Sequence, residues 1–343
     1  MTDPKRVLIV LPNWLGDIVM ALPSVAAARN HFASQHLAVA LPRAMTPVVR
    51  MLTGLDAVVS LEGGQDGFAS DVATLAGRKY DVAVLFPNSF RSAWMTYRAG
   101  IMERWGYAAD FRRLLLTRAV KRPREGGHHS NYYLTLLGKL KISIEDDNAT
   151  LVVTDSQRAR AARLLERHRV ASSRPIVVMA PGSAHGHAKQ WLPERYAEVA
   201  RRSVIELGQS VVFVGGIDDR PVGRAIESFI TEAGHGLSDE RRIVNLIGHT
   251  DLTELIGILA NCEACVSNDT GAMHLAAVLT KPVVAVFGPS DERVTAPIGP
   301  HELLSHPVRC RPCLLRDCPI DHRCMTGIST NDVFSALVRC LNS

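Results

Sequence analysis

The sequence predicts an α/β protein with two doubly wound parallel sheets. Short runs such as VLIVL (7–11) and VVAVF (283–287) are apolar at every position, which is typical of parallel strands buried on both faces. These runs alternate with longer segments of helical pattern, once before and once after a polar stretch, EDDN (145–148). We therefore expect two domains, over residues 1–150 and 151–343.

The expected elements follow in chain order. The first half has strands at RVLIVL (6–11), HLAVAL (36–41), DAVVSL (56–61) and YDVAVLF (80–86). Helices are predicted over 17–32 and 66–77, where apolar residues recur at helical spacing. The second half has strands at PIVVMA (175–180), SVVFVGG (210–216), IVNLIG (243–248), ACVSN (264–268) and PVVAVFG (282–288).

Length and composition indicate a soluble, two-domain protein. The chain has 343 residues, of which 21% are charged and 47% hydrophobic, and no run approaches the ~20 apolar residues of a membrane span. The first residues, MTDPKR, lack the apolar core of a signal peptide, and the seven cysteines fit a reducing compartment. We therefore expect a cytoplasmic protein.

Positive charge is concentrated in the first half. Lys and Arg outnumber Asp and Glu 18 to 13 in residues 1–150, which accounts for the net charge of +5. The basic residues of the segment DFRRLLLTRAVKRPRE are Arg112, Arg113, Arg118, Lys121, Arg122 and Arg124. They form either an ordinary solvated surface or a face for an anionic partner. Nucleic acid is not expected, because no aromatic residues interleave with these charges.

Ligands of open parallel sheets bind beyond the carboxyl ends of the strands, so the loops there should hold the site, in a cleft between the two sheets. In SNDTGAMHLAA (267–277), Asp269 or Thr270 suits a helix N-cap and Gly271 allows close approach to the first-turn N–H groups. Such a helix start attracts a pyrophosphate, with His274 on the same face. The alternative is an ordinary capped helix with a buried histidine.

Two further loops of the second half carry polar candidates. In APGSAHGHAKQW (180–191), Gly182 and Ser183 offer backbone and hydroxyl donors, and Lys189 offers a positive charge for a phosphate leaving group. Lys189 could instead be a surface lysine, and Trp191 is expected to be a packing residue.

Acidic and hydroxyl residues follow the next two strands. In GGIDDR, Asp218 is preferred by position over Asp219 as an acceptor for ribose hydroxyls. In GHTDLTEL, Thr250 or Asp251 caps a helix, and Glu254 completes a capping box from Asp251.

The first half offers a carboxylate and a polar loop. Asp17 in PNWLGD either caps a helix that begins at Ile18 or serves chemistry at the cleft. Asn88, Ser89 and Arg91 follow another strand and suit an anionic acceptor. No Asp-x-Asp triplet, Walker lysine motif or GxSxG elbow occurs, which favours a metal-free binder of a nucleotide diphosphate.

A cysteine-rich segment near the C-terminus raises the question of zinc. Its spacing is C-x2-C-x4-C-x5-C, and it contains Cys310, Cys313, Cys318 and Cys324, with His322 nearby. Four thiolates at short spacing could hold structural zinc, but reduced packing cysteines are the favoured interpretation. We expect no metal, and the zinc content of protein purified without added metal is the measurement that checks this.

Three motifs in this order resemble the ADP-heptose:lipopolysaccharide heptosyltransferases, family 9 glycosyltransferases of the GT-B fold. They are LPNWLGDIVMALPSV (11–25), PGSAHGHAKQWLPERYAEVA (181–200) and VSNDTGAMHLAA (266–277). NSFRSAW (88–94) and CRPCLLRDCPIDHRCM (310–325) look more like type II of the family than type I. The resemblance spans nearly the whole chain.

The resemblance implies two Rossmann-like domains, an acceptor domain over 1–150 and a donor domain over 151–343. The donor would be ADP-L-glycero-β-D-manno-heptose, and the acceptor the anionic heptosyl-Kdo2-lipid A, reached by peripheral contact with the inner face of the inner membrane. Transfer would invert the anomeric carbon, with no cofactor and no metal.

The resemblance also implies residue roles. Asp17 matches the general base, and Lys189 matches the residue that neutralises the donor phosphates. Asp218 matches an acidic ligand of the nucleoside, and Thr250 a donor contact. The residues that match the donor-binding motif are Asp269, Thr270, Gly271 and His274. Where some relatives carry paired hydroxyl residues before the lysine, this chain has Gly182-Ser183.

Three alternatives stay open at this point. A sibling heptosyltransferase, type I or III, would share the donor motifs and differ in its acceptor. A non-catalytic sugar-nucleotide binding protein of the same fold would keep Asp269 to His274 and could dispense with Asp17. A non-hydrolysing nucleotide-sugar epimerase would share the architecture but lack these loop motifs.

Overall fold

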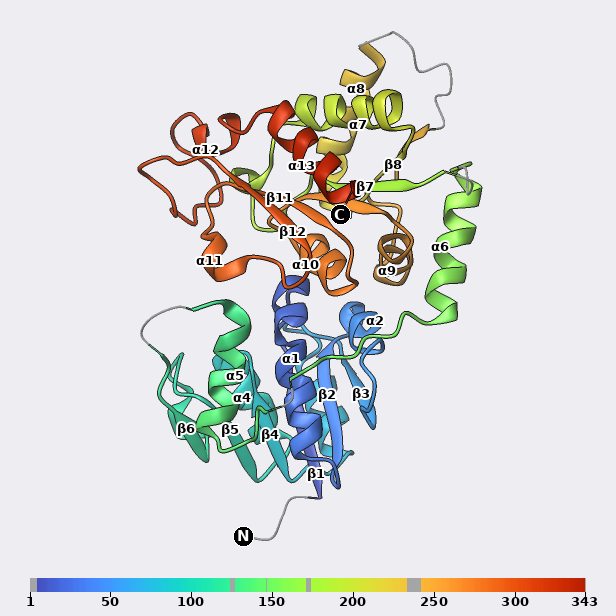
Figure 1. Ribbon diagram of the computed structural model, residues 1–343. Coiled ribbons are helices and arrows are strands. Elements are labelled where there is room, and N and C mark those ends of the chain that lie inside the picture. The colour runs from blue at the N-terminus through green and yellow to red at the C-terminus, as the bar shows by residue number, and fades with distance from the viewer. Residues whose placement is uncertain (1–4, 124–126, 146, 171–173, 233–241, 343) are drawn as a thin grey trace. The chain divides into compact units, whose positions relative to one another are not determined.

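The computed structural model describes residues 5–123, 127–145, 147–170, 174–232 and 242–342 (Figure 1). Arg124 of the basic segment lies outside them. The chain divides into two compact units, Met1–Val152 and Val153–Ser343. The sequence places this boundary between 150 and 151. None of the helices in the described ranges combines the length and apolar character needed to cross a bilayer.

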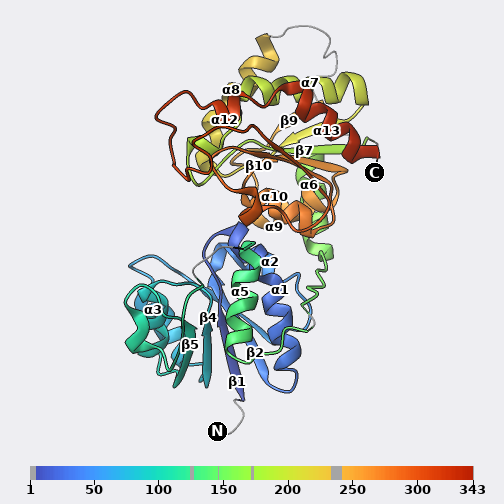
Figure 2. The same ribbon diagram turned by 60° about the vertical axis from the view of Figure 1, so that its left-hand side comes forward.

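The first unit contains a six-stranded parallel sheet in the order β3-β2-β1-β4-β5-β6. Its strands are β1 (Arg6–Val10), β2 (His36–Pro42), β3 (Ala57–Leu61), β4 (Val82–Leu85), β5 (Glu103–Tyr107) and β6 (Arg118–Val120). Its helices are α1 (Leu15–His31), α2 (Thr46–Val49), α3 (Phe68–Ala76), α4 (Phe90–Arg98) and α5 (His129–Lys139), with 3-10 turns η1 (Arg43–Met45) and η2 (Arg112–Leu115). Helices α1 and α5 pack side by side (Figures 1 and 2).

The second unit repeats this plan with the order β12-β11-β10-β7-β8-β9, again with parallel neighbours. Its strands are β7 (Ile176–Ala180), β8 (Ser210–Phe213), β9 (Ile243–Asn245), β10 (Ala264–Asn268), β11 (Val283–Phe287) and β12 (His301–Ser305). Its longer helices are α6 (Asp155–Arg167), α7 (Pro193–Leu207), α8 (Arg220–Glu232), α9 (Leu252–Ala260), α10 (Gly271–Val278) and α13 (Thr330–Asn342). Its short helices and turns are α11 (Glu292–Thr295), α12 (Arg323–Thr326), η3 (His187–Lys189) and η4 (Ile217–Asp219).

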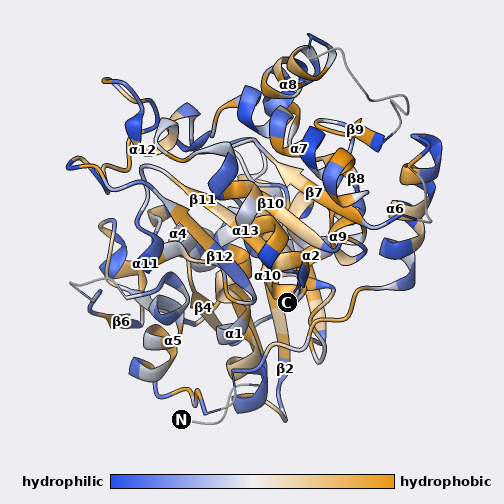
Figure 3. Cartoon of the chain, turned by 45° about the horizontal axis from the view of Figure 1, so that its top comes forward, coloured by the Kyte–Doolittle hydropathy of each residue, from blue (hydrophilic) through white to orange (hydrophobic). Residues whose placement is uncertain are grey.

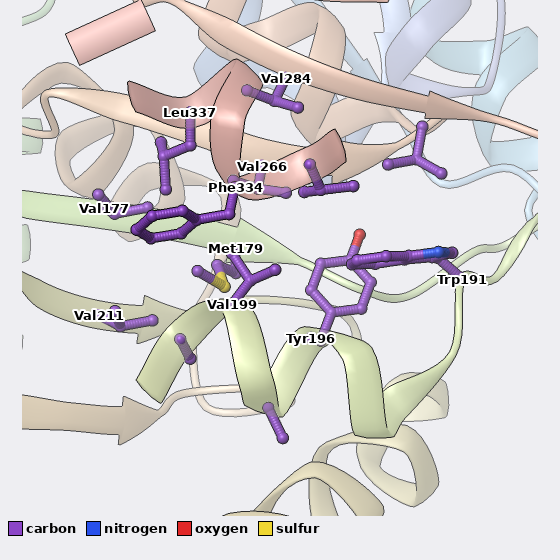
Figure 4. Packing of buried hydrophobic residues seen from close by; sticks show 14 of the residues in the cluster. Val177, Met179, Trp191, Tyr196, Val199, Val211, Val266, Val284, Phe334 and Leu337 are labelled. Carbon is purple, nitrogen blue, oxygen red and sulfur yellow. The ribbon is translucent and has the colours of Figure 1, made fainter. Parts of the chain in front are cut away.

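The central strands form the core of the second unit. Every residue of β7, β10 and β11 is buried, and β7 and β11 are coloured apolar in Figure 3. On one face, Trp191 and Tyr196 contact each other edge to face, and Phe334 and Leu337 of α13 lie near Val177 (Figure 4). Full burial of such side chains stabilises the fold by about 1.5–3 kcal/mol each. Trp191 is therefore a packing residue, as predicted.

The predicted fold class is confirmed, but the sequence missed β5, β6 and β12. Strands β6 and β12 are the outermost strands of their sheets, so each has one neighbour. Strand β12 alternates exposed and half-buried residues. Strand β5 carries the charged Glu103 and Arg104 at its start. A search for continuous apolar runs detects strands buried on both faces and passes over these.

Candidate functional site

The strand order reverses once in each sheet, between β1 and β4 in the first unit and between β7 and β10 in the second. Ligands of doubly wound proteins bind beyond the carboxyl ends of the strands at such a reversal. The segments that leave these four strands carry Asp17 and Asn88 in the first unit, and Lys189 and Asp269 in the second. These four predicted site residues thus lie where each topology favours binding, whereas Asp218 and Thr250 follow the next strands, β8 and β9.

In the second unit, the buried amide of Asn268 joins two of these loops. Its Nδ2 donates to the carbonyl oxygens of Pro181 at 2.6 Å and Gly182 at 3.2 Å. Its Oδ1 accepts from the Tyr196 hydroxyl at 3.0 Å and from the Trp191 backbone N–H at 3.2 Å. Asn268 had no predicted role, although it stands inside the motif SNDTGAMHLAA.

Lys189 and Asp269 form an ion pair beside the start of α10. Lys189 Nζ lies 2.6 Å from Asp269 Oδ2, and the two side chains are only 15% and 4% exposed. Lys189 is therefore not the surface lysine of the alternative interpretation. Thr295 Oγ1 lies 3.5 Å from Asp269 Oδ2, and Nε2 of the buried His274 lies 4.0 Å from Asp269 Oδ1. An ammonium group has three donors, so Lys189 can bind further oxygens while Asp269 holds it.

Thr270 is the N-cap residue of α10, and Gly271 is the first helical residue, as predicted. In the described part of the chain, the Thr270 side chain makes no hydrogen bond to the first-turn backbone; its hydroxyl lies 3.2 Å from Ser267 Oγ. First-turn N–H groups have no intrahelical acceptor, and the positive end of the helix dipole lies there. This helix start can therefore receive an anion.

The turn at Gly182 and Ser183 corrects one expectation. The Ser183 backbone N–H donates to Asp219 Oδ1 at 3.0 Å, so it is occupied and does not await a ligand. Asp219 Oδ2 accepts from the Gly216 N–H at 2.9 Å, so this carboxylate links the two loops. A Cβ at position 182 would lie 2.1 Å from Asp219 Cγ, which explains the glycine. The buried Ser183 hydroxyl has no hydrogen-bond partner among the described residues and remains a candidate ligand.

In the loops after β8 and β9, the structure gives different surroundings to the two neighbouring candidates of each loop. Asp219 is committed to the link just described, whereas Asp218 in η4 is exposed. Asp251 is the N-cap residue of α9, and its reciprocal bonds with Glu254, at 2.9 and 3.0 Å, form the predicted capping box. Thr250 is half-buried and lies outside this cap.

In the first unit, Asp17 lies in the first turn of α1 and is not its N-cap residue. The helix begins at Leu15 with Trp14 as N-cap, three residues before the predicted start at Ile18. Gly16 is thus the second residue of the helix. Glycine is tolerated there because the first turn has few hydrogen bonds to lose. The interpretation of Asp17 as the cap is therefore wrong.

The carboxylate of Asp17 faces a cluster of rings from α5. Asp17 Oδ1 lies 3.7 Å from His129 Nε2, which lies 3.1 Å from the Tyr133 hydroxyl. Burial lowers the pKa of His129, and the nearby Asp17 charge opposes this only in part. Burial also raises the pKa of Tyr133. The imidazole and the phenol beside Asp17 are consequently neutral near pH 7.

Asn88 joins the same cluster through Tyr132. Its Nδ2 donates to the Tyr132 hydroxyl at 2.8 Å, and the Tyr132 ring lies parallel to that of His129, with centroids 5.7 Å apart. The guanidinium of Arg122 lies 5.8 Å from the Tyr132 centroid. The sequence analysis missed His129 and Tyr132; the signal that could have found them is the ring-rich HHSNYY at 128–133.

Ser89 and Arg91, the other predicted acceptor residues, have structural partners. Ser89 is the N-cap residue of α4 and accepts from the Ser92 N–H at 3.3 Å. The Arg91 guanidinium lies 3.6 Å from the buried carboxylate of Asp71 and over the Phe68 ring at 4.8 Å. These contacts direct Arg91 towards α3.

The four cysteines of the C-terminal segment line a cavity of about 490 Å³, together with His306 and His322. Burial raises the pKa of the Cys324 thiol, and the three other thiols raise it further. Across the described residues, no group of three or more His, Cys, Asp or Glu side chains is arranged to hold a metal ion. The expectation that this segment binds no zinc stays a prediction, and the zinc content of the purified protein is the measurement that tests it.

Comparison with known proteins assigns the family. Residues 72–323 match the model of glycosyltransferase family 9, heptosyltransferase. The chain belongs to glycosyltransferase family 9. Lipooligosaccharide heptosyltransferase 2 of Haemophilus influenzae is 28% identical over 306 residues, which span 86% of each chain. Lipopolysaccharide heptosyltransferase 2 of Escherichia coli K12 is 27% identical over 304 residues, again 86% of each.

A solved structure of this family has the same architecture. The structure of E. coli ADP-heptose LPS heptosyltransferase II matches with a TM-score of 0.81 at 25% identity over 98% of both chains. The predicted GT-B fold and the resemblance to type II are therefore confirmed, and the protein is a glycosyltransferase. The family match begins at residue 72 and does not reach Asp17. The case for Asp17 in this heptosyltransferase rests on its own surroundings.

Proposed function

We propose that the chain transfers L-glycero-D-manno-heptose from ADP-heptose to heptosyl-Kdo2-lipid A in the lipopolysaccharide inner core, with inversion and without a metal. The names of the type 2 relatives support heptose transfer to lipopolysaccharide or lipooligosaccharide, and the name of the matching structure supports ADP-heptose as donor. The observation that carries the proposal is the Lys189–Asp269 pair beside the uncapped start of α10. A nearly buried cation next to the positive end of a helix suits a diphosphate.

The second unit would hold the donor. Lys189, the first-turn N–H groups at Thr270 and Gly271, and the Ser183 hydroxyl would bind the diphosphate. Asp218 would accept hydrogen bonds from ribose hydroxyls, and Thr250 would add a contact near the same end of the sheet. Further assigned donor residues are Gly182, whose missing Cβ keeps the turn compact, Asp269 and His274.

Asp17 would act as the general base. A sugar hydroxyl is a weak nucleophile, and a carboxylate that takes its proton during attack lowers the barrier. The hydroxyl oxygen forms the new glycosidic bond as the anomeric carbon–oxygen bond to ADP breaks, so a single displacement inverts that carbon. His129 lies 3.7 Å from this carboxylate, and burial holds the pKa of the imidazole below its ordinary value, so the ring adds no charge beside Asp17 near pH 7.

Charge on the leaving diphosphate would be balanced by the protein itself. Lys189 and the positive end of the α10 dipole would stabilise the negative charge that grows as ADP departs. The proposal therefore expects full turnover in EDTA. A loss of turnover in EDTA that magnesium restores would contradict metal independence.

The first unit would bind the acceptor. Asn88, Ser89 and Arg91 are the predicted contacts, and Arg122 beside Tyr132 adds a cation for the acidic Kdo and phosphate groups. Because this acceptor is lipid-linked, the enzyme would work in peripheral contact with the inner face of the inner membrane.

Mass spectrometry of products tests the function. The protein is incubated with ADP-heptose and a panel of Kdo2-lipid A acceptors that carry no, one or two heptoses. The proposal predicts addition of one heptose to the singly heptosylated acceptor only. Transfer to the acceptor without heptose, or only to the one with two, would assign the chain to a sibling type. ADP-heptose binding without any transfer would make it a non-catalytic binding protein.

A further inference from the structure

The first unit exposes apolar side chains to an unusual degree at one loop. Phe111 and Leu114 are 97% and 95% exposed, and Met102 is 77% exposed. A singly exposed apolar residue is ordinary on a soluble protein, whereas neighbouring ones that form a patch indicate a contact surface. Phe111 is the N-cap residue of the 3-10 turn η2 and Leu114 lies within that turn, so two highly exposed apolar side chains belong to one short loop.

This loop is held firmly in place. The Arg112 side chain is completely buried; its Nε donates to the Tyr107 carbonyl at 3.0 Å, and its Nη1 donates to Ser92 Oγ at 3.0 Å. Asp110 Oδ2 accepts from the Phe90 N–H at 2.7 Å. Phe111 has a φ of +56°, a left-handed conformation that costs a bulky residue stability. The fold therefore keeps Phe111 in solvent by specific contacts.

Aromatic rings continue the surface along α4. Phe90, Trp94 and Tyr97 stand at i, i+4 and i+7, with ring centroids 6.3 and 5.4 Å apart. Arg98 lies over the Trp94 ring at 5.5 Å, and Arg104 over the Tyr97 ring at 5.2 Å. The helix thus presents a stripe of rings accompanied by guanidinium groups.

Arg104 joins the stripe to the loop. Its Nε donates to the Leu115 carbonyl at 2.6 Å, and its Nη1 donates to the Met102 carbonyl at 2.9 Å. One guanidinium therefore contacts Tyr97 of α4, the segment after α4, and the end of η2. We call the resulting surface the aromatic–basic face; it comprises Phe90, Trp94, Tyr97, Met102, Phe111 and Leu114.

The charges around this face are complementary to an anionic partner. The exposed Arg98 and Arg113 and the half-buried Arg104 accompany it. These three arginines outnumber the two nearby acidic groups, Asp110, which accepts from the Phe90 N–H, and Glu103, which accepts from the Trp105 indole at 2.9 Å. Tryptophan and tyrosine with arginine are the composition of protein surfaces at a bilayer boundary, where apolar tips insert among the lipids.

We propose that the aromatic–basic face docks the protein on an anionic lipid bilayer, with Phe111 and Leu114 inserted below the headgroups. The proposal deepens the proposed function, because it locates the membrane contact that a lipid-linked acceptor requires. Positive charge around fully exposed apolar side chains favours an anionic bilayer over a protein partner or a second copy of the chain.

Sedimentation with vesicles of phosphatidylethanolamine and phosphatidylglycerol tests the docking. The chain should bind these vesicles, more weakly at high salt, and should bind phosphatidylcholine vesicles poorly. Phe111→Ser combined with Leu114→Ser should weaken binding by about tenfold or more, because two inserted side chains are lost. Ile320→Ser in the second unit, where the residue is 71% exposed, is the matched control and should leave binding unchanged.

A charge variant and three contradicting results complete the vesicle test. Arg113→Gln should weaken vesicle binding and reduce its salt dependence, because it removes one positive charge and leaves Phe111 and Leu114 unchanged. Failure of the wild type to bind the anionic vesicles, or unaltered binding by the double variant, would overturn the proposal. So would a change from dimer to monomer in the double variant with vesicle binding intact, since the face would then join two copies.

Transfer assays distinguish this proposal from the proposed function. With a deacylated, water-soluble acceptor the double variant should match the wild type, whereas the KM for vesicle-embedded acceptor should rise. Loss of transfer to the soluble acceptor would place the face in the acceptor site and overturn its docking role. Vesicle binding by a wild type that transfers no heptose would leave the docking standing and overturn the proposed function.

Discussion

Individual side chains at the donor site have separable tasks. The ammonium of Lys189 is nearly buried and is held at 2.6 Å by Asp269, so its position is fixed before a substrate arrives. Such preorganised charge stabilises a transition state because nothing needs to reorient as charge develops. The carboxylate of Asp219, by contrast, bonds to two backbone N–H groups of its own unit. Lys189 therefore acts in the proposed reaction, whereas Asp219 holds two loops of the second unit together.

The first prediction concerns Lys189. Lys189→Ala should lower kcat by about 10²-fold or more, since one preorganised donor at a developing charge contributes that much. It should also weaken ADP-heptose binding. Lys281→Ala, which changes the other lysine of the second unit, is the control and should retain normal kinetics. Normal kcat in Lys189→Ala would remove this residue from the mechanism.

A second prediction separates the two neighbouring aspartates. Asp218→Ala should weaken ADP binding in calorimetry and leave the free energy of unfolding unchanged, because Asp218 is exposed. Asp219→Ala should lower the free energy of unfolding by about 1–3 kcal/mol, because two backbone donors lose their acceptor. If Asp218→Ala binds ADP normally, the ribose contact lies elsewhere.

A third prediction follows from the buried imidazole of His129. Its pKa is below the ordinary 6.5 in the folded state, so the unfolded chain binds the extra proton first as pH falls. The neutral ring's contribution to stability is complete above pH 6.5 and is lost as pH falls below that value. His129→Gln should therefore flatten the decline of the free energy of unfolding between about pH 6.5 and 5. A decline as steep as in the wild type would contradict a buried, neutral ring.

At the scale of elements, the sequence indicates residues that follow strong apolar strands, and only the packing of helices shows which distant residues lie together. The motif around Asp269 and Lys189 could be found because both residues follow strong apolar runs. His129 could not be connected to Asp17, since 112 residues separate them and only the packing of α1 on α5 brings them together. The start of α1 was placed late, and β5, β6 and β12 were missed because charged or polar residues begin or interrupt them.

Asn268 shows how one side chain can hold several elements together. It ends β10 and bonds to the loop after β7 and to Tyr196 of α7. Asn268→Leu should lower the free energy of unfolding by about 2 kcal/mol or more, because buried donors and carbonyls lose their partner. It should also weaken ADP binding, since the turn at Gly182 is no longer held. Urea denaturation checks the first effect, and Asn261→Leu at the end of α9 is the control, with a smaller loss. Wild-type stability would show that Asn268 is dispensable.

At the scale of the whole molecule, two similar sheets supply different chemistry from the same topological position. The reversal of strand order between β1 and β4 presents a carboxylate and neutral rings, whereas that between β7 and β10 presents a cation and a helix start. A carboxylate suits proton removal from an acceptor, and the cationic site suits a departing diphosphate. The fold and the positions of Asp17 and Lys189 beyond strand ends were predictable from the sequence, because doubly wound sheets bind ligands at a fixed edge, whereas the rings beside Asp17 were not.

The central claim is that Asp17 is the general base, and turnover of Asp17→Asn tests it most directly. Asparagine keeps the shape of the side chain but cannot accept the proton, so kcat should fall by about 10²–10⁴-fold while ADP-heptose affinity holds. Asp155→Asn, which also removes a carboxylate from the first turn of a helix, is the matched control and should keep normal kcat. Both variants should lose no more than about 1 kcal/mol of stability. If Asp17→Asn keeps more than about a tenth of the wild-type kcat, well short of the general-base range, the carboxylate is not the base.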